Sequence, residues 1–361
     1  MRIKRIDVGE MQIPLVTPFK TSLRTATHVD DIIVRVVSDD GLCGFGEAAP
    51  TAVITGDIKP SIRGAIEEVI APSLVGMDIE DIDGVSRKLR TCILKNTSAK
   101  AAVDLALYDL YAKSLGKPLY KVLGGGSREV ETDITISVDT IDKMVADSVK
   151  AVAEGYRILK VKVGKEGIKD VDRIKAIRDA VGDAVVIRVD ANQGWNAKEA
   201  VRIIRKLEDA DLNIDLVEQP VSAHDKAGMI YVTANSSTPI LADESVFTPE
   251  DAIDIIKSRA ADLINIKLMK TGGIYEALKI AAIGEIYNVP CMMGCMLESK
   301  ISVSAGAHLA GAKGIINRAD LDGPGLCSID PYEGGPEFNA GMIILNETPG
   351  IGIESVPCFT D

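Results

Sequence analysis

Residues 157–165 read RILKVKVGK, a run of strand-forming residues interrupted by two lysines. Side chains of a strand alternate between its two faces, so Lys160 and Lys162 share one face and the apolar residues beside them share the other. Two ammonium groups side by side on an otherwise apolar strand predict that their face borders a polar site.

Short apolar runs recur around this stretch with a regular spacing. A first strand is expected at 132–138, and later runs end near residues 163, 190, 218, 243, 267, 294 and 320. The spacing between these ends is 24 to 28 residues, with amphipathic helical pattern between them. Eight strands alternating with helices at this spacing predict an α/β fold, a modified TIM barrel of (β/α)₇β form.

The chain on either side of the repeat has a different pattern. Residues 1–125 read as strands followed by helices, which predicts an N-terminal α+β capping domain. The barrel domain is expected over 126–325. The Gly- and Pro-rich segment 326–361 is expected to return and pack on the capping domain.

Acidic residues end three consecutive predicted strands: Asp190 in RVDANQGW, Glu218 in LVEQP and Asp243 in LADES. Active sites of such barrels form at this end of the strands. Each carboxylate could instead cap the helix that follows it, but three in succession favour a shared site. Oxygen ligands without nearby His or Cys favour Mg²⁺, with Mn²⁺ as a second possibility.

A further lysine, Lys267 in NIKLMKTGG, ends the sixth strand, across the barrel from Lys160 and Lys162. A lone inward lysine could be an ion-pair partner, whereas lysines that face each other across a cation suit proton transfer. Lys160 and the cation would both repel the charged form of Lys162. The pKa of Lys162 is therefore expected to fall toward the working range of a base.

The eighth strand ends RADLDG, and alternation places Asp320 and Asp322 on one face. Asp-Gly is also a turn signal, so the pair could simply end the strand in a turn. From the residues alone both readings stay open.

Taken together, the Lys-Val-Lys pair, the three carboxylates and the NIKLMKTGG motif resemble the muconate-lactonizing subgroup of the enolase superfamily over the whole chain. The resemblance implies that Asp190, Glu218 and Asp243 hold Mg²⁺. It also implies two catalytic bases on opposite faces of a planar enediolate, Lys162 for the D centre and Lys267 for the L centre.

Within the subgroup, the sequence is most similar to dipeptide epimerases of the L-Ala-D/L-Glu epimerase type. The substrate contacts that this resemblance implies are Arg24, Thr135, Lys160, Cys295, Leu297, Asp320, Leu321 and Asp322. Asp320 and Asp322 would bind the α-ammonium of the substrate, and Lys160 would help to bind its carboxylate. Arg24, in the PFKTSLRTA loop, would suit a carboxylate side chain on the second residue.

The expected activity is that of an isomerase. It would invert the α-carbon of the C-terminal residue of a dipeptide by 1,1-proton transfer, with L-Ala-L-Glu and L-Ala-D-Glu as the pair. Hydrophobic or other dipeptides are the first alternative. Muconate cycloisomerisation and o-succinylbenzoate synthesis are less favoured because their substrates lack an ammonium group. A non-catalytic binding or structural role is less favoured, because it would not require three metal ligands and two opposed lysines.

The three histidines make a mandelate-racemase-like reaction less favoured. Such an enzyme carries a histidine base at the end of the seventh strand, and none of the three lies there.

The composition argues against two classes of binding partner. A net charge of −12 without a basic stripe argues against nucleic acid. No uncharged apolar run reaches membrane-spanning length, and six scattered cysteines fit a reducing compartment. We expect a cytoplasmic protein, and the resemblance implies a homo-oligomer.

Overall fold

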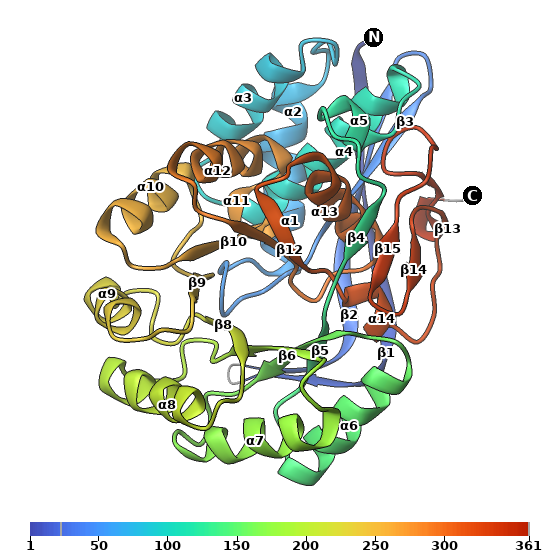
Figure 1. The fold of residues 1–361 in the computed structure, drawn as a ribbon. Coiled ribbons are helices and arrows are strands. Elements are labelled where there is room, and N and C mark those ends of the chain that lie inside the picture. Colours follow the sequence, from blue (N-terminus) through green and yellow to red (C-terminus); the bar gives the residue numbers. More distant parts are fainter. Residues whose placement is uncertain (22–23, 360–361) are drawn as a thin grey trace.

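The N-terminal part of the chain forms an antiparallel sheet in the order β1 (Ile3–Lys20), β2 (Thr25–Ser38) and β3 (Cys43–Ala48). The structure is a computed structural model that describes residues 1–21 and 24–359 (Figure 1). Helix α4 (Thr97–Ser114) packs on β3. A Cβ on Gly46 would lie 1.9 Å from the carbonyl oxygen of Ala102 in α4, so this close approach requires glycine.

The other helices of the capping part follow β3 along the chain and precede the barrel strands. They are α1 (Lys59–Gly64), the π-helical turn η1 (Ala65–Ile70), α2 (Ala71–Leu74), α3 (Ile82–Cys92) and α5 (Leu119–Val122). Helix α4 is buried over most of its length because it lies between the sheet, α3 and the barrel helices. The predicted α+β cap is confirmed.

Eight parallel strands form the barrel sheet: β5 (Ile134–Ile136), β6 (Ile158–Lys162), β7 (Val186–Asp190), β8 (Ile214–Glu218), β9 (Ile240–Ala242), β10 (Leu263–Lys267), β11 (Cys291–Gly294) and β12 (Ile316–Asp320). The connecting helices are α6 (Ile141–Ala153), α7 (Lys169–Val181), α8 (Ala197–Asp209), α9 (Lys226–Ala234), α10 (Pro249–Ser258), α11 (Leu268–Thr271), α12 (Ile274–Tyr287) and α13 (Lys300–Ala312). They lie outside the strands (Figure 1). The (β/α)₇β prediction is confirmed.

Strand register brings the charged residues to one level of the barrel. Lys162, Asp190 and Glu218 are direct neighbours across β6, β7 and β8. Lys267 is level with Gly294, which is level in turn with Asp320. Because in-register neighbours of a parallel sheet point to the same face, these side chains converge at the carboxyl-terminal mouth.

The barrel is nearly closed, with β5 and β12 at the two ends of the strand order. Hydrogen bonds that involve side chains cross this seam. The backbone N–H of Thr135 donates to Oδ2 of Asp322 at 2.7 Å, and the N–H of Leu321 donates to Oγ1 of Thr132 at 2.8 Å. Residues near the mouth therefore also hold the seam together.

After β12 and the short α14 (Gly323–Leu326), the chain returns through small antiparallel pairs. Strand β15 (Met342–Ile344) pairs with β14 (Glu337–Asn339) and with β4 (Glu129–Glu131), and β13 (Glu333–Gly334) pairs with β16 (Ile353–Ser355). In the last turn η2 (Pro357–Phe359), the Phe359 ring stacks on Phe45 of the capping sheet with centroids 6.4 Å apart. The domain boundaries at 125 and 325 stay a prediction.

Two further sequence expectations concern cysteines and membranes. All six cysteines are free thiols, and Cys291 and Cys295 are buried. Across residues 1–21 and 24–359, the helices are all too short or too polar to traverse a lipid bilayer.

Candidate active site

Lys160 lies at the centre of a buried cluster of carboxylates. Its Nζ is 2.6 Å from Oδ2 of Asp320, 2.7 Å from Oε2 of Glu218 and 3.1 Å from Oδ2 of Asp190. Burial alone would lower the pKa of Lys160, but the three carboxylates raise it well above the ordinary value. Lys160 is therefore a fixed positive charge, which suits binding and not proton abstraction.

The two predicted bases each contact a predicted metal ligand. The Nζ of Lys162 lies 2.6 Å from Oδ2 of Asp190, and the Nζ of Lys267 lies 2.8 Å from Oδ2 of Asp243. Burial opposes the charge on Lys267, but Asp243 outweighs it and raises the pKa of Lys267. Lys160 and Lys162 both contact Oδ2 of Asp190, and the predicted influence of Lys160 on Lys162 stays a prediction.

Lys162 and Lys267 lie on opposite sides of the barrel. Lys162 ends β6 and Lys267 ends β10, and these strands stand four places apart in the order of eight. In a barrel of eight strands, that separation corresponds to opposite walls. A planar group bound between them would present one face to each lysine.

The carboxylates at the mouth fit a divalent cation. Burial, reinforced by Asp190, raises the pKa of Glu218 to about 7. Burial, reinforced by Asp243 and Asp190, raises the pKa of Glu244 to about 8. Both side-chain oxygens of Glu244 are buried, and no hydrogen-bond donor serves them within the described residues. Buried carboxylate oxygens with too few donors are a suitable environment for a hard cation. Among the described residues, the three carboxylates with oxygens within 4.8 Å of one another are Asp133, Asp320 and Asp322, and the predicted ligands Asp190, Glu218 and Asp243 are not that group.

Two residues that support this cluster were missed from the sequence. Asn265 donates from Nδ2 to Oε1 of Glu218 at 2.9 Å, and it shares the inward face of β10 with Lys267. Strand alternation was the signal that could have found it. A Cβ on Gly294 would lie 2.5 Å from Oδ1 of Asn265 and 3.0 Å from Cε of Lys267, so glycine leaves room for both.

Lys270 is the second missed residue, and it is fully buried. Its Nζ lies 2.7 Å from Oδ1 of Asp243 and donates to the carbonyl oxygen of Asn265 at 3.0 Å. It lies beyond the end of β10, in the single helical turn α11, so the alternation of β10 does not predict its direction. Lys270 and Lys267 together hold the two oxygens of Asp243.

A cavity lies between the barrel mouth and the capping part. The predicted residues that line it are Arg24, Thr135, Lys162, Lys267, Cys295, Leu297, Asp320 and Asp322. Apolar lining comes from Phe19, Val53, Ile54 and Met296. The other predicted residues are buried and do not contribute to its described lining: Lys160, Asp190, Glu218, Asp243 and Leu321.

Arg24 supplies a cation at the capping side of this cavity. Burial lowers its pKa, and the charge of Asp31 partly opposes that effect. In the described part of the chain, no carboxylate lies within ion-pair distance of the Arg24 guanidinium. A partly buried guanidinium without a carboxylate partner among the described residues is suited to an anionic ligand group.

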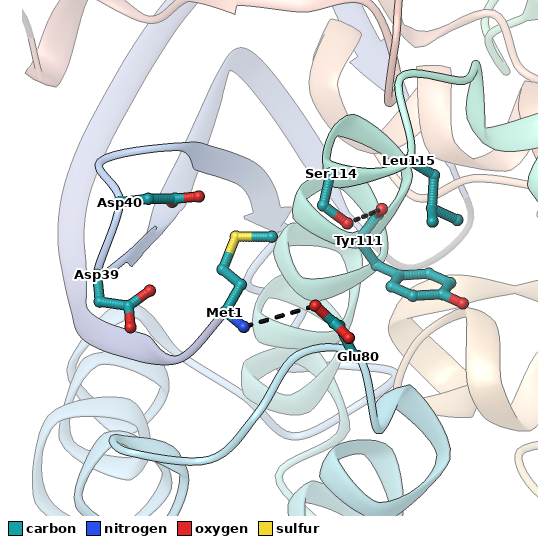
Figure 2. A pocket seen from close by; sticks show the side chains of 7 residues that line it. All are labelled: Met1, Asp39, Asp40, Glu80, Tyr111, Ser114 and Leu115. Carbon is teal, nitrogen blue, oxygen red and sulfur yellow. Dashed lines mark hydrogen bonds and ion pairs between the residues drawn. The ribbon is translucent and has the colours of Figure 1, made fainter.

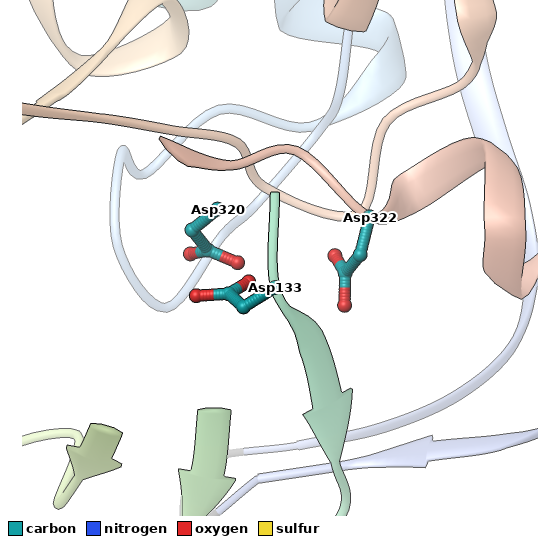
Figure 3. A group of neighbouring side chains, drawn as sticks. All are labelled: Asp133, Asp320 and Asp322. Atoms are coloured by element: carbon teal, nitrogen blue, oxygen red, sulfur yellow. The ribbon is translucent and has the colours of Figure 1, made fainter. Parts of the chain in front are cut away.

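Asp320 and Asp322 form the acidic side of the cavity, and Asp133 lies beside them (Figure 3). Burial, with a contribution from Asp320, raises the pKa of Asp322 to about 6. Lys160 outweighs burial at Asp320 and lowers its pKa to about 2. The sequence analysis missed Asp133, which precedes β5 and carries no motif.

A second hollow surrounds the N-terminus (Figure 2). Its described lining residues are Met1, Asp39, Asp40, Glu80, Tyr111, Ser114 and Leu115. The α-ammonium of Met1 lies 3.3 Å from Oδ1 of Asp78 and 3.6 Å from Oε1 of Glu80. None of the predicted site residues belongs to this lining, so the barrel mouth is the candidate active site.

Comparison with known proteins matches two families that adjoin along the chain. Residues 5–124 match the mandelate racemase / muconate lactonizing enzyme N-terminal domain, and residues 143–357 match the enolase C-terminal domain-like family. The L-Ala-D/L-Glu epimerase of Clostridium acetobutylicum is 53% identical over 99% of both chains. The hydrophobic dipeptide epimerase of Enterococcus faecalis is 41% identical over 98% of this chain and 99% of its own.

Solved structures agree with these matches. The substrate-liganded L-Ala-D/L-Glu epimerase from Bacillus subtilis superposes with a TM-score of 0.97 at 47% identity, over 98% of this chain and 99% of its own. The dipeptide epimerase from E. faecalis, complexed with Mg and L-Leu-L-Tyr, gives 0.95 at 41% identity, over 98% and 100%. Similarity of this extent covers the cap, the barrel and the C-terminal return.

Proposed function

Because the chain belongs to the enolase superfamily and is an isomerase, we propose that it is a Mg²⁺-dependent dipeptide epimerase acting on L-Ala-L-Glu and L-Ala-D-Glu. The observation that carries the proposal is the position of Lys162 and Lys267 on opposite walls, with buried carboxylates on the strands between them. Similarity to named L-Ala-D/L-Glu epimerases supports the choice of substrate.

Two opposed lysines account for inversion without redox chemistry. A neutral Lys267 would remove the α-proton of the L-epimer, and a protonated Lys162 would deliver a proton to the other face of the planar enediolate. The reverse reaction exchanges the two roles. Each lysine contacts a carboxylate, which stabilises its ammonium form. The lysine that delivers the proton can therefore stay protonated until the enediolate forms.

The acidic residues would hold the cation and keep it in place. Asp190, Glu218 and Asp243 are the proposed Mg²⁺ ligands, and Asn265 and Lys270 orient two of them. When bound, Mg²⁺ supplies positive charge that stabilises the extra negative charge on the substrate carboxylate. Lys160, as a fixed ammonium, would add a second positive charge next to the same carboxylate.

The ends of the cavity match the two ends of the proposed substrate. Asp320 and Asp322 would bind the α-ammonium of the first residue, and Arg24 would bind the side-chain carboxylate of the second. The substrates of muconate cycloisomerisation and of o-succinylbenzoate synthesis carry no ammonium group and would leave the two aspartates without a partner. Cys295, Leu297 and Thr135 would contact the peptide between these ends.

A second candidate is epimerisation of hydrophobic dipeptides. Phe19, Val53, Ile54 and Met296 give the cavity an apolar wall near Arg24, and the E. faecalis relative is named a hydrophobic dipeptide epimerase. Both candidate functions use the same proton-transfer chemistry. They differ only in the substrate side chain that the cavity accepts. Comparison of the two substrates on one enzyme decides between them.

The test is deuterium exchange in D₂O with Mg²⁺, followed by NMR at the α-carbon of the C-terminal residue. The wild type should convert each epimer of Ala-Glu into the other and incorporate deuterium. Lys162→Ala should lose inversion but still exchange the L-epimer, and Lys267→Ala should exchange the D-epimer only. Such a split assigns one lysine to each face.

The control is Lys226→Ala, which removes an exposed lysine paired with Asp254 at 2.8 Å. It should epimerise at the wild-type rate. Absence of exchange on Ala-Glu, hydrophobic and cationic dipeptides alike would refute the epimerase proposal. Equal loss of exchange on both epimers in both lysine variants would refute the assignment of one base per face.

A further inference from the structure

Asp133 lies beside Asp320 and Asp322, behind the described lining of the cavity and outside the strands. It immediately precedes β5, and carboxylate oxygens of Asp133, Asp320 and Asp322 lie within 4.8 Å of one another (Figure 3). All three residues are buried. Three carboxylates at this spacing repel one another strongly unless cations or protons compensate them.

The cations around the three carboxylates are shared with other anions. Lys160 contacts Asp320, but it also contacts two of the proposed metal ligands. Arg188 donates from Nη1 to Oδ2 of Asp133 at 2.9 Å, and its Nε binds Asp215 at 3.0 Å. Asp322 accepts the backbone N–H of Thr135 at 2.7 Å, a neutral donor that does not compensate its charge. The group therefore carries excess negative charge.

Oδ1 of Asp133 is an atom that can carry a compensating proton. Its Oδ1 is buried and has no hydrogen-bond donor among the described residues, while Oδ2 is bound to Arg188. Burial, then the charge of Asp320, raises the pKa of Asp133 well above its ordinary value although Arg188 opposes this. A carboxylic acid at this position would supply the missing hydrogen.

The titratable and charged groups that face this cluster come from every surrounding element. They are Asp320 at the end of β12, Asp322 before α14, Lys160 and Lys162 of β6, Arg188 of β7, Lys267 of β10, Cys295 after β11 and Tyr156 before β6. Cys295 and Tyr156 both have a raised pKa because of burial, so they stay neutral near pH 7. Neither of these two groups therefore supplies a proton to the cluster near pH 7.

We propose that Asp133 is a positioning residue of the amine site, which shares one proton with Asp320 and Asp322 and releases it when the substrate ammonium binds. This inference rests on the proposed function. An O–H bond of the carboxylic acid breaks and its proton passes to solvent, while the ammonium keeps its three protons. The incoming cation replaces the proton, so the net charge of the cluster is unchanged.

Proton and ammonium then compete for the same carboxylates. As pH falls, the cluster holds its proton more tightly and the KM for the dipeptide rises, by up to about tenfold per pH unit. The turnover number kcat should change little through this effect, because proton transfer to carbon takes place at Lys162 and Lys267. Asp133→Asn makes the position permanently neutral, so it should raise KM and remove its dependence on pH.

The test is calorimetry of Mg²⁺-loaded enzyme at pH 6.5 in buffers of different ionisation enthalpy. The probe is an equilibrium mixture of L-Ala-L-Glu and L-Ala-D-Glu, so that no net epimerisation adds heat. The ammonium of the probe is already formed at this pH. The wild type should release about one proton per bound dipeptide, and Asp133→Asn should bind more weakly and release none.

Two results would overturn this inference while leaving the epimerase intact. One is binding by the wild type without proton release, a measurement that needs no variant to fold. The other is undiminished release in Asp133→Asn, which would assign the proton to another group such as a lysine of the cavity. Absence of both binding and turnover would instead count against the proposed function.

Discussion

The Nζ of Lys162 lies 2.6 Å from Oδ2 of Asp190, which pairs a proposed base with a proposed metal ligand. An ammonium group and a divalent cation compete for the same carboxylate, because each is drawn to its negative charge and each repels the other. Lys267 stands in the same relation to Asp243 at 2.8 Å. Binding of the cation is therefore coupled to both bases.

This competition predicts that removal of the ammonium strengthens cation binding. Lys162→Met should bind Mg²⁺ about tenfold more tightly than the wild type, a change of about 1.4 kcal/mol, when measured by calorimetry. Lys226→Met, at an exposed lysine, is the matched control and should bind Mg²⁺ as the wild type does. Unchanged or weaker binding by Lys162→Met would show that the lysine and the cation do not compete.

Arg24 is predicted to select the side chain of the second residue. Arg24→Met should lower kcat/KM for L-Ala-L-Glu by about tenfold to a hundredfold, the cost of losing a hydrogen bond to a charged group. Turnover of a hydrophobic dipeptide such as L-Ala-L-Leu should be retained or improved. Steady-state kinetics with both substrates gives the ratio, and full activity on Ala-Glu would exclude the charge-pairing role.

Lys270 is predicted to contribute to stability through a fully buried ion pair. Lys270→Met removes the ammonium 2.7 Å from Asp243 and leaves two backbone carbonyls without their donor. The free energy of unfolding should fall by about 3 kcal/mol in urea titrations. Lys226→Met breaks an exposed pair and should change it by less than about 1 kcal/mol. Similar values for the two variants would contradict the prediction.

His308 is predicted to make the protein sensitive to acid. Burial in α13 lowers its pKa to about 3 from 6.5, and its Nδ1 accepts the backbone N–H of Tyr120 at 3.1 Å. Between these pKa values the unfolded chain binds a proton that the folded chain does not. His308 therefore lowers the free energy of unfolding as pH falls, by about 2 kcal/mol at pH 5.

The measurement is the free energy of unfolding of the wild type and of His308→Asn between pH 7 and pH 5. Asparagine can accept the same backbone N–H without titrating, so the variant should lose less stability over this interval. Carboxylates with a raised pKa, such as Asp104, act in the opposite direction in both proteins and cancel in the comparison. Parallel curves for the two proteins would contradict the assignment to His308.

Much of the architecture could be predicted because it follows from local pattern. The spacing of apolar runs identified eight strands, five of which end at the expected residue: Asp190, Glu218, Lys267, Gly294 and Asp320. Strands β6 and β9 end one residue earlier than expected and β5 two residues earlier, so Asp243 directly follows its strand. A parallel barrel presents all strand ends at one mouth, so the residues that end strands could be grouped without knowledge of their contacts. Asn265 could have been found by the same reasoning.

Other parts of the site follow no local pattern. Lys270 lies in the helical turn after β10, so strand alternation does not position it. Asp133 falls within the strand expected at 132–138, on the face of Thr135, but the observed β5 begins only at Ile134. Arg188 is inward on β7 in the layer below Asp190, but only the closed barrel shows that it reaches Asp133 and the carbonyl oxygen of Ala319. These contacts of Arg188 join strands that are distant in sequence, so they depend on how the barrel closes.

By itself, the sequence determined the alternation of strands and helices, the shared face of Lys160 and Lys162, and the acidic ends of three consecutive strands. These follow from the two-residue period of a strand, which acts within a few residues. Only the tertiary structure decided which charges meet. The seam bond between Thr135 and Asp322 joins residues 187 positions apart, and barrel closure, not a local preference, brings them together.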